Sequence, residues 1–509
     1  MSIDIETYRL KAQEAIEYVF VKEYHNSLGI PMPIVKMLLP DDANYSTGQY
    51  YITIDKTWQI HLNFGKLPIS YHEFQNEVKV LTRHEIEHYM CCPFDVITHF
   101  RMLKRIRDVY YKHFSHLGIN IEYACGAISN QAADIIVDTK NYYRHSKETL
   151  KSEIDWIKIG ANISACPRHC KLMFLTKEAI WKEDLGINET DPEFLKIVHQ
   201  LADSFTKNGI EDKSSFLDKV EEYAEIFFKL YVEDQKNPQQ SSQQGSQQQN
   251  GQQGSQQQSG QWGVGRPKDG DEHGNAFVFA DPDKVKEAIE VLAEETSVEE
   301  FIDLLAIAGI IGMSDKQKGV LWFNVQSANI IPIVEFSNTG NKSSYTYPSV
   351  WRIGDPIEEL DLMLTYMTSP RLIPGMTTKK WGYVSNDDNG TESKQMDLLL
   401  VVDTSGSMGS AMKESANMHQ AVLASYGILS YFESTKSKVA FIGFSDKIDA
   451  YVDWSDKYDD VRERLLTNGH GGTKFPISRI KSTLDVRSRD LVTVLITNGD
   501  LGNINESVS

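Results

Sequence analysis

Apolar side chains recur every three to four positions through most of the chain before residue 235, which is the spacing of amphipathic helices. The segments that keep this spacing over the greatest length are residues 5–24, 73–90, 120–143 and 214–232. Between the first two of them, residues 47–64 alternate polar and apolar side chains, which predicts a pair of strands. The N-terminal part is therefore predicted to have a helix-rich α+β fold.

A segment rich in Gln, Ser and Gly over residues 235–262 interrupts this pattern. It offers almost no apolar surface to bury, so nothing offsets the conformational entropy that would be lost on ordering it. We interpret residues 235–275 as a flexible linker that lets the parts on either side move relative to each other.

Helical spacing returns after the linker, where Asp281 and Pro282 are typical of a helix start and residues 298–310 predict a second helix. Residues 321–381 combine a β-rich stretch with an amphipathic helix near residues 356–366. We expect this connector region to pack on the last domain.

From residue 397 the pattern changes to continuous apolar strands that alternate with helices. The elements predicted here are strands over residues 397–402, 439–444 and 491–497, a helix over 412–432 and another helical stretch between the last two strands. This order is typical of a parallel sheet covered by helices on both faces. The C-terminal part is therefore predicted to be an α/β domain.

The length of 509 residues exceeds what one hydrophobic core usually supports, so we predict a multidomain chain. The predicted parts are a helix-rich domain over 1–234, the linker over 235–275, a helical and β connector over 276–393 and the α/β domain over 394–509.

Composition narrows the classes of function. The net charge of −19 opposes a role dominated by phosphate contacts, so nucleic-acid binding is not expected. The N-terminus lacks a basic region followed by an apolar core, and no apolar run is long enough to cross a bilayer. We therefore expect a cytoplasmic protein with no membrane partner.

The five cysteines are an odd number in a large chain, which is unlike a disulfide framework and favours reduced thiols. Cys166 and Cys170 bracket His169, a grouping that could belong to a second zinc site. Four ligands at a recognisable spacing are not visible, so buried free cysteines are the favoured interpretation.

Residues 81–90 read LTRHEIEHYM and contain the motif H-E-x-x-H. Its spacing places His84 and His88 on one face of a helix, where two imidazoles can bind one zinc ion while Glu85 reaches a metal-bound water. The alternative is a pair of surface histidines on a helix rich in glutamate. A zinc site also needs a third protein ligand, and finding one would argue against surface histidines.

The predicted helix over residues 120–143 offers this ligand, because Asn130, Asp134 and Asp138 are four residues apart and share a face. We assign Asp134 to the metal and Asp138 to orienting a ligand histidine, although the two roles could be exchanged. The two helices together resemble those of the gluzincin and aspzincin peptidases.

This resemblance implies a zinc metallopeptidase, a hydrolase in which Glu85 takes a proton from a zinc-activated water and later protonates the leaving amine. An oxyanion donor is also needed, and the nearby candidates are Tyr142, Tyr143, Arg144 and His145. Glu87 departs from the family pattern, because zincins usually keep its position uncharged; we expect it to face solvent.

Residues 397–410 read DLLLVVDTSGSMGS, an apolar strand that runs directly into D-x-S-x-S. At the carboxyl end of a parallel strand, Asp403, Ser405 and Ser407 can supply oxygen ligands to Mg²⁺ or a similar divalent ion. The simpler alternative is a strand-to-helix turn capped by a serine.

These residues resemble the metal-ion-dependent adhesion site (MIDAS) of von Willebrand factor A (VWA) domains, which are Rossmann-like α/β folds with a parallel sheet. The resemblance places Thr473, in the sequence GGTKF, at the position of the family's metal-contacting threonine. The family's T-D-G aspartate is replaced by Asn498, which leaves Asp500 as a substitute. The resemblance also implies that the last part of the chain is incomplete, which suggests a fragment or completion by a partner chain.

A zincin-like domain followed by a VWA domain resembles bacterial proteins that are associated with MoxR-type AAA+ ATPases. The resemblance implies that the VWA domain recruits such an ATPase or a protein or peptide substrate. A second hypothesis stays open, in which the chain is a non-catalytic VWA adaptor or scaffold that retains a metal site.

Overall fold

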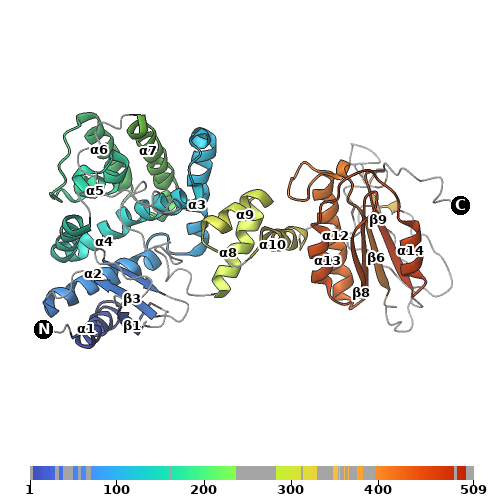
Figure 1. The fold of residues 1–509 in the computed structure, drawn as a ribbon, viewed down its shortest axis with the longest axis horizontal. Helices are drawn as coiled ribbons and strands as arrows, with labels where there is room; N and C mark the ends of the chain where they lie inside the picture. The colour runs from blue at the N-terminus through green and yellow to red at the C-terminus, as the bar shows by residue number, and fades with distance from the viewer. Residues whose placement is uncertain are drawn as a thin grey trace, which may run out of the picture. The chain divides into compact units, whose positions relative to one another are not determined.

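A computed structural model places the elements of this chain (Figure 1). Apart from a few single residues, it describes residues 4–28, 34–37, 50–54, 59–64, 70–160, 163–236, 282–310, 313–328, 348–352, 377–381, 396–486 and 490–499. The chain divides into two compact units. The first comprises Met1–Gln326 with Ala411–His419, and the second comprises Ser327–Ser410 with Gln420–Ser509.

The first unit begins with helix α1 (Ile5–Tyr18), which packs on helix α2 (Tyr71–Met90). Their shared core contains Tyr8, Ala12, Ile16, Phe74, Val78 and Ile86. Because these apolar residues occupy one face of α2, the opposite face is left for polar side chains.

A small sheet with the strand order β1-β3-β2 accompanies these helices. Strands β2 (Tyr50–Ile54) and β3 (Gln59–Phe64) pair antiparallel, which confirms the predicted strand pair. Strand β1 (Ile34–Met37) runs parallel to β3 and was not predicted.

Helix α4 (Ile121–Gly160) is central to the first unit, because it packs on α2, α3 (Val96–Val109), α5 (Arg168–Trp181) and α7 (Phe216–Lys236). Helix α6 (Pro192–Thr206) covers α5 and also contacts α7. A break in the helical backbone at His145, where φ is −135°, divides α4 into two segments. The predicted helix over 120–143 is the first of them.

Helices α8 (Pro282–Glu295) and α9 (Val298–Ile307) pack on α3, and α9 also packs on α4. An ion pair of 2.7 Å joins Arg107 of α3 to Asp303 of α9. The helices on both sides of the Gln-rich segment thus belong to one unit, whereas the pattern predicted a linker between separate domains.

The predicted connector is divided between the units. Helix α10 (Asp315–Ala328) begins in the first unit, and the chain from Ser327 groups with the second. Strands β4 (Pro348–Val350) and β5 (Lys379–Trp381) pair antiparallel in this part. Most of the linker, and most of the helix predicted near residues 356–366, lie outside the described residues.

The second unit contains a four-stranded sheet with the order β8-β7-β6-β9. Strands β6 (Asp397–Asp403), β7 (Val439–Phe444) and β9 (Leu491–Ile496) are parallel, and β8 (Ile448–Ser455) pairs antiparallel with β7. The predicted helical stretch between β7 and β9 is present, but the sheet is mixed, because the antiparallel strand β8 was not predicted. The alternating pattern IDAYVDWS forms an edge strand, and helix α13 (Tyr458–Leu465) follows it.

Helices lie on both faces of this sheet, with α12 (Asn417–Ser434) and α13 on one side and α14 (Ile477–Leu484) on the other (Figure 1). Every residue of β6 and β7 is buried. Ile480 and Leu484 of α14 pack against the buried cluster that β6 and β7 form, which includes Leu399 and Ile442. This double coverage explains why β7 and the interior of β6, between Asp397 and Asp403, carry no charged or polar side chain.

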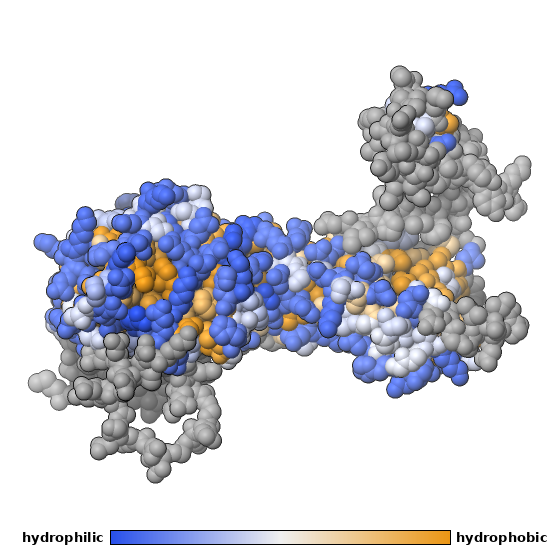
Figure 2. Space-filling view, turned by 90° about the horizontal axis from the view of Figure 1, so that it is seen from above, coloured by the Kyte–Doolittle hydropathy of each residue, from blue (hydrophilic) through white to orange (hydrophobic). Residues whose placement is uncertain are grey.

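Polar and charged residues dominate the face drawn in Figure 2, and the apolar residues form small areas between them. In the described part of the chain, no helix combines the length and the apolar character that a membrane crossing requires.

Candidate metal centre

Helix α2 places His84 and His88 one turn apart on one face of the helix. The helix begins at Ser70, whose hydroxyl accepts a hydrogen bond from the backbone amide of Glu73. The two Nε2 atoms of the histidines lie 3.1 Å apart, and the rings are nearly perpendicular, at 87°. The two imidazoles therefore present their Nε2 atoms to one point.

Helix α4 brings Asp134 to the same point. Its Oδ1 lies 3.5 Å from His84 Nε2 and 3.3 Å from His88 Nε2. This oxygen is buried and makes no hydrogen bond. Two ligands of a tetrahedral zinc ion, at the usual bond lengths, are separated by roughly 3.3–3.5 Å. The two distances to Asp134 lie in this range and the 3.1 Å between the two Nε2 atoms is slightly shorter, so the arrangement is close to that of three ligands of one metal ion.

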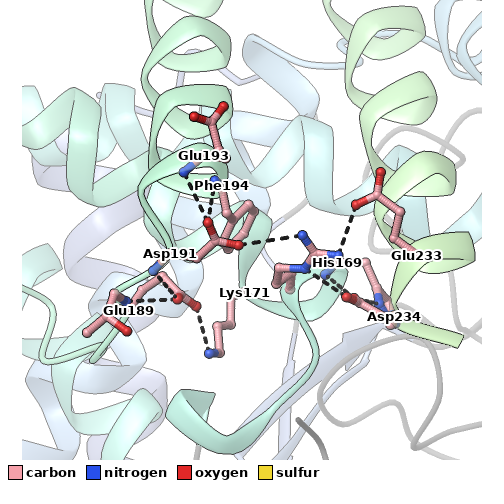
Figure 3. Close-up of polar contacts among 10 residues, drawn as sticks. His169, Lys171, Glu189, Asp191, Glu193, Phe194, Glu233 and Asp234 are labelled. Atoms are coloured by element: carbon pink, nitrogen blue, oxygen red, sulfur yellow. Dashed lines mark hydrogen bonds and ion pairs between the residues drawn. The ribbon is translucent and has the colours of Figure 1, made fainter. Parts of the chain in front are cut away.

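Within the described residues, His84, His88 and Asp134 are the one group of three or more His, Cys, Asp or Glu side chains close enough to share a metal ion. Cys166, His169 and Cys170 form no such group. The Nδ1 of His169 instead bonds an Asp234 oxygen 2.8 Å away, at the end of α7 (Figure 3). The second zinc site considered from the sequence thus gains no support.

The second nitrogen of each imidazole has its own acceptor. His84 Nδ1 lies 2.6 Å from Asp138 Oδ1, and His88 Nδ1 lies 2.8 Å from the carbonyl oxygen of Cys92. A proton on each Nδ1 leaves Nε2 as the metal-binding atom. The geometry thus favours Asp134 as the ligand and Asp138 as the residue that orients His84.

Asn130 supports Asp134 from one turn earlier in α4. Its Nδ2 donates a hydrogen bond of 3.0 Å to Asp134 Oδ2, the oxygen that does not face the histidines. This contact occupies Oδ2 and leaves Asp134 Oδ1 available to bind a metal ion. Asn130, Asp134 and Asp138 share the face that their spacing predicted.

The carboxylates beside His84 change its protonation in the metal-free protein. Burial by itself lowers the pKa of His84, but the negative charges of Asp138 and Asp134 raise it to about 10. Asp138 stays ionised: although burial opposes its charge, Lys177 and His84 hold the pKa of this carboxyl well below its usual range. The metal-free site therefore carries an imidazolium where the metal would bind.

Zinc binding at neutral pH is expected to release about one proton per ion, because His84 Nε2 must lose its proton to become a ligand. Titration calorimetry in buffers of different ionisation enthalpy measures this number. Affinity should also rise with pH up to the pKa of His84, about 10. A binding enthalpy that is independent of the buffer would contradict the expected protonation.

Glu85 follows His84 in α2 and is half-buried. Burial raises its pKa, with Asp134 and Asp138 adding to the rise and the two histidines opposing it. A carboxyl group with a raised pKa next to a metal site is suited to proton transfer near neutral pH.

Glu87 does not face solvent, which corrects the expectation from the sequence; it is fully buried. Its carboxylate lies 2.8 Å from Lys140 Nζ and 2.9 Å from Arg144 Nη1, and it accepts a hydrogen bond of 2.8 Å from the hydroxyl of Tyr24. The charge that departs from the zincin pattern is therefore neutralised by two cations of α4.

The four candidates for an oxyanion donor lie in or just after the first segment of α4. The hydroxyl of Tyr142 donates to Glu183 at 2.8 Å, and Arg144 is paired with Glu87. Tyr143 is 59% exposed, and His145 is the residue at which α4 breaks. None of these observations directs one of the four toward the metal ligands.

Asp403 of the second predicted site ends strand β6 and is fully buried. The backbone amide of Ser405 donates to Asp403 Oδ1 at 2.8 Å, and the hydroxyl of Thr497 donates to Oδ2 at 2.9 Å. Ser405 Oγ lies 3.1 Å from Ser407 Oγ. The three residues predicted from D-x-S-x-S therefore present their oxygens at one edge of the sheet.

Other loops meet at this edge. The loop that carries Thr473 lies alongside, because the amide of Gly406 bonds the carbonyl of Gly471 at 3.2 Å. Asn498 donates a hydrogen bond from Nδ2 to Ser407 Oγ at 2.9 Å. Asp500 lies outside the described residues. This edge of the sheet therefore combines serine hydroxyl oxygens with the buried carboxylate of Asp403.

Comparison of the chain with models of protein families, with curated proteins and with solved structures found no match. The geometry of the two sites therefore carries the functional argument.

Proposed function

We propose that this chain is a zinc-dependent peptidase. The observation that carries the proposal is the convergence of two Nε2 atoms and one carboxylate oxygen, from His84, His88 and Asp134, at separations close to those of the ligands of tetrahedral zinc. Two imidazoles and one carboxylate are a ligand set typical of catalytic zinc, which leaves a fourth position open.

The chain's own residues then have distinct tasks. When bound, zinc supplies a Lewis acid that lowers the pKa of water and polarises a carbonyl group. Glu85 accepts a proton from the attacking water and passes it to the leaving amine, and its raised pKa suits both transfers. Asp138 and the carbonyl oxygen of Cys92 hold the two imidazoles in the tautomer that binds metal.

The second unit is proposed to hold Mg²⁺ or a similar ion at Asp403, Ser405, Ser407 and Thr473, with Asp500 as a further ligand. The hydroxyl oxygens of Ser405 and Ser407 beside the buried carboxylate of Asp403 support this assignment, because hard divalent ions prefer oxygen ligands. An ion held there with open positions would recruit a carboxylate of a protein partner. In keeping with the sequence resemblance, we expect that partner to be a MoxR-type AAA+ ATPase.

One observation favours a second candidate, a non-catalytic adaptor that keeps the metal site. Tyr142 and Arg144, two of the proposed oxyanion donors, are engaged by Glu183 and Glu87. Peptide hydrolysis depends strongly on such a donor, so its absence would leave metal binding without turnover.

Elemental analysis of the purified full chain tests the metal assignment. Wild type is expected to contain zinc near one equivalent, His84→Ala to lose it, and Asp403→Ala to keep it. Loss in only the first variant follows from the ligand set, because Asp403 belongs to a different site. Zinc-loaded wild type should then hydrolyse denatured casein, and chelation should stop the reaction. A wild type without zinc would overturn the proposal.

A further inference from the structure

Helix α5 brings a lysine to the back of the candidate metal centre. Lys177 is 2% exposed, and its Nζ lies 2.6 Å from Asp138 Oδ2 and 2.9 Å from Glu153 Oε1. The other oxygen of Asp138 contacts His84 Nδ1 at 2.6 Å. A continuous chain of buried polar contacts therefore runs from Glu153 through Lys177 and Asp138 to His84.

Asp138 needs a partner to serve His84 as an acceptor. A buried carboxylate is costly to keep unless each of its oxygens has a polar or charged partner. Lys177 pairs with Asp138, and its contact fixes the oxygen that His84 does not use. Glu153 in turn holds the lysine from its far side.

The position of Lys177 is fixed from the beginning of its helix. In the first turn of α5, Arg168 pairs with Asp234 at 2.8 Å, and His169 bonds the same carboxylate (Figure 3). Lys171, one turn later, pairs with Glu189 at 2.9 Å. These contacts anchor α5 to its neighbours, so Lys177 meets Asp138 from a rigid element.

We propose that Lys177 is a positioning residue of the metal centre, which fixes Asp138 so that the ring of His84 directs Nε2 at the metal. This inference rests on the proposed function only in assuming that the site binds zinc. It goes beyond that function by assigning a role to a lysine that touches no metal ligand.

A purely structural role for Lys177 is the alternative, and Lys171 separates the two. Lys171 belongs to the same helix, is also buried at 8% exposure, and pairs with one carboxylate that is not part of the metal centre. Replacing it removes a buried ion pair of the same helix without touching the chain that leads to His84.

The experiment measures zinc affinity of the full chain by competition with a chromophoric chelator, and the visible spectrum of the Co²⁺-substituted protein. Lys177→Met is expected to bind zinc about 10–100-fold more weakly than wild type, the usual loss when support of a ligand histidine is removed. Its Co²⁺ spectrum should also shift. Lys171→Met should match wild type in both measurements.

Lys177→Met leaves two buried carboxylates without their cation and can fail to fold. The double variant Lys177→Met with Glu153→Gln removes one charge of each sign, and it should show the same weaker binding. Affinity and spectrum like those of wild type in either folded variant, or an equal loss in Lys171→Met, would overturn the inference. A wild type that binds no zinc would instead overturn the proposed function, and this inference with it.

Discussion

Glu85→Gln is expected to keep its zinc and to lose peptide hydrolysis by about 10²–10⁴-fold, the usual contribution of a positioned general base. Glutamine has the same shape but cannot take up the proton of the attacking water. Zinc should stay because Glu85 is not one of the three ligands His84, His88 and Asp134. Turnover of a protein substrate and zinc content, measured on the same preparation, give both quantities.

Glu77→Gln is the matched control for this change. Glu77 lies on the same helix, and burial raises its pKa as it does that of Glu85, but its carboxylate bonds Ser152 at 2.7 Å. The control should leave zinc content and turnover unchanged. If Glu85→Gln hydrolyses substrate at the rate of wild type, Glu85 is not the base, and the adaptor hypothesis becomes the better one.

Glu87→Ala is expected to destabilise the first unit by about 3–5 kcal/mol, the cost of removing one partner from a buried ion pair. Lys140 is only 6% exposed, so the change would leave it as a buried cation. Its remaining partner would be Glu211, which lies 3.1 Å away and is more exposed than Glu87. Arg144 is half exposed and would regain water. Urea unfolding of the full chain should show the loss in the transition that releases zinc.

Lys151→Gln provides the comparison for an exposed pair. Lys151 and Asp155 are 57% and 38% exposed in their side chains, so their ion pair should contribute less than about 1 kcal/mol. If Glu87→Ala also lowered the free energy of unfolding by less than about 1 kcal/mol, Glu87 would not be buried between its two cations.

Much of the first site follows from local rules. Four-residue spacing places His84 and His88 on one face of α2, and the same rule places Asn130, Asp134 and Asp138 on one face of α4. Local rules do not say which helix packs against which. The exchange of roles between Asp134 and Asp138 therefore stayed open until the packing of α4 on α2 favoured one assignment.

Two predictions that were made from local sequence pattern differ from the structure. Residues 448–455 form strand β8, which was not predicted although polar and apolar side chains alternate along it. The Gln-rich composition predicted a linker between domains, but α8 and α9 pack on α3 in the same unit as α7. Composition describes a segment itself and carries no information on where its two ends attach.

Two features could be predicted from residue order alone: the spacing of candidate ligands along each helix and the passage from a buried strand into D-x-S-x-S. Both depend on the backbone period of one element. The burial of Glu87 between Lys140 and Arg144, and the contact of Lys177 with Asp138, depend on the folded chain. These contacts join residues about 40 to 60 positions apart, and their formation depends on how whole helices pack, which no local period encodes.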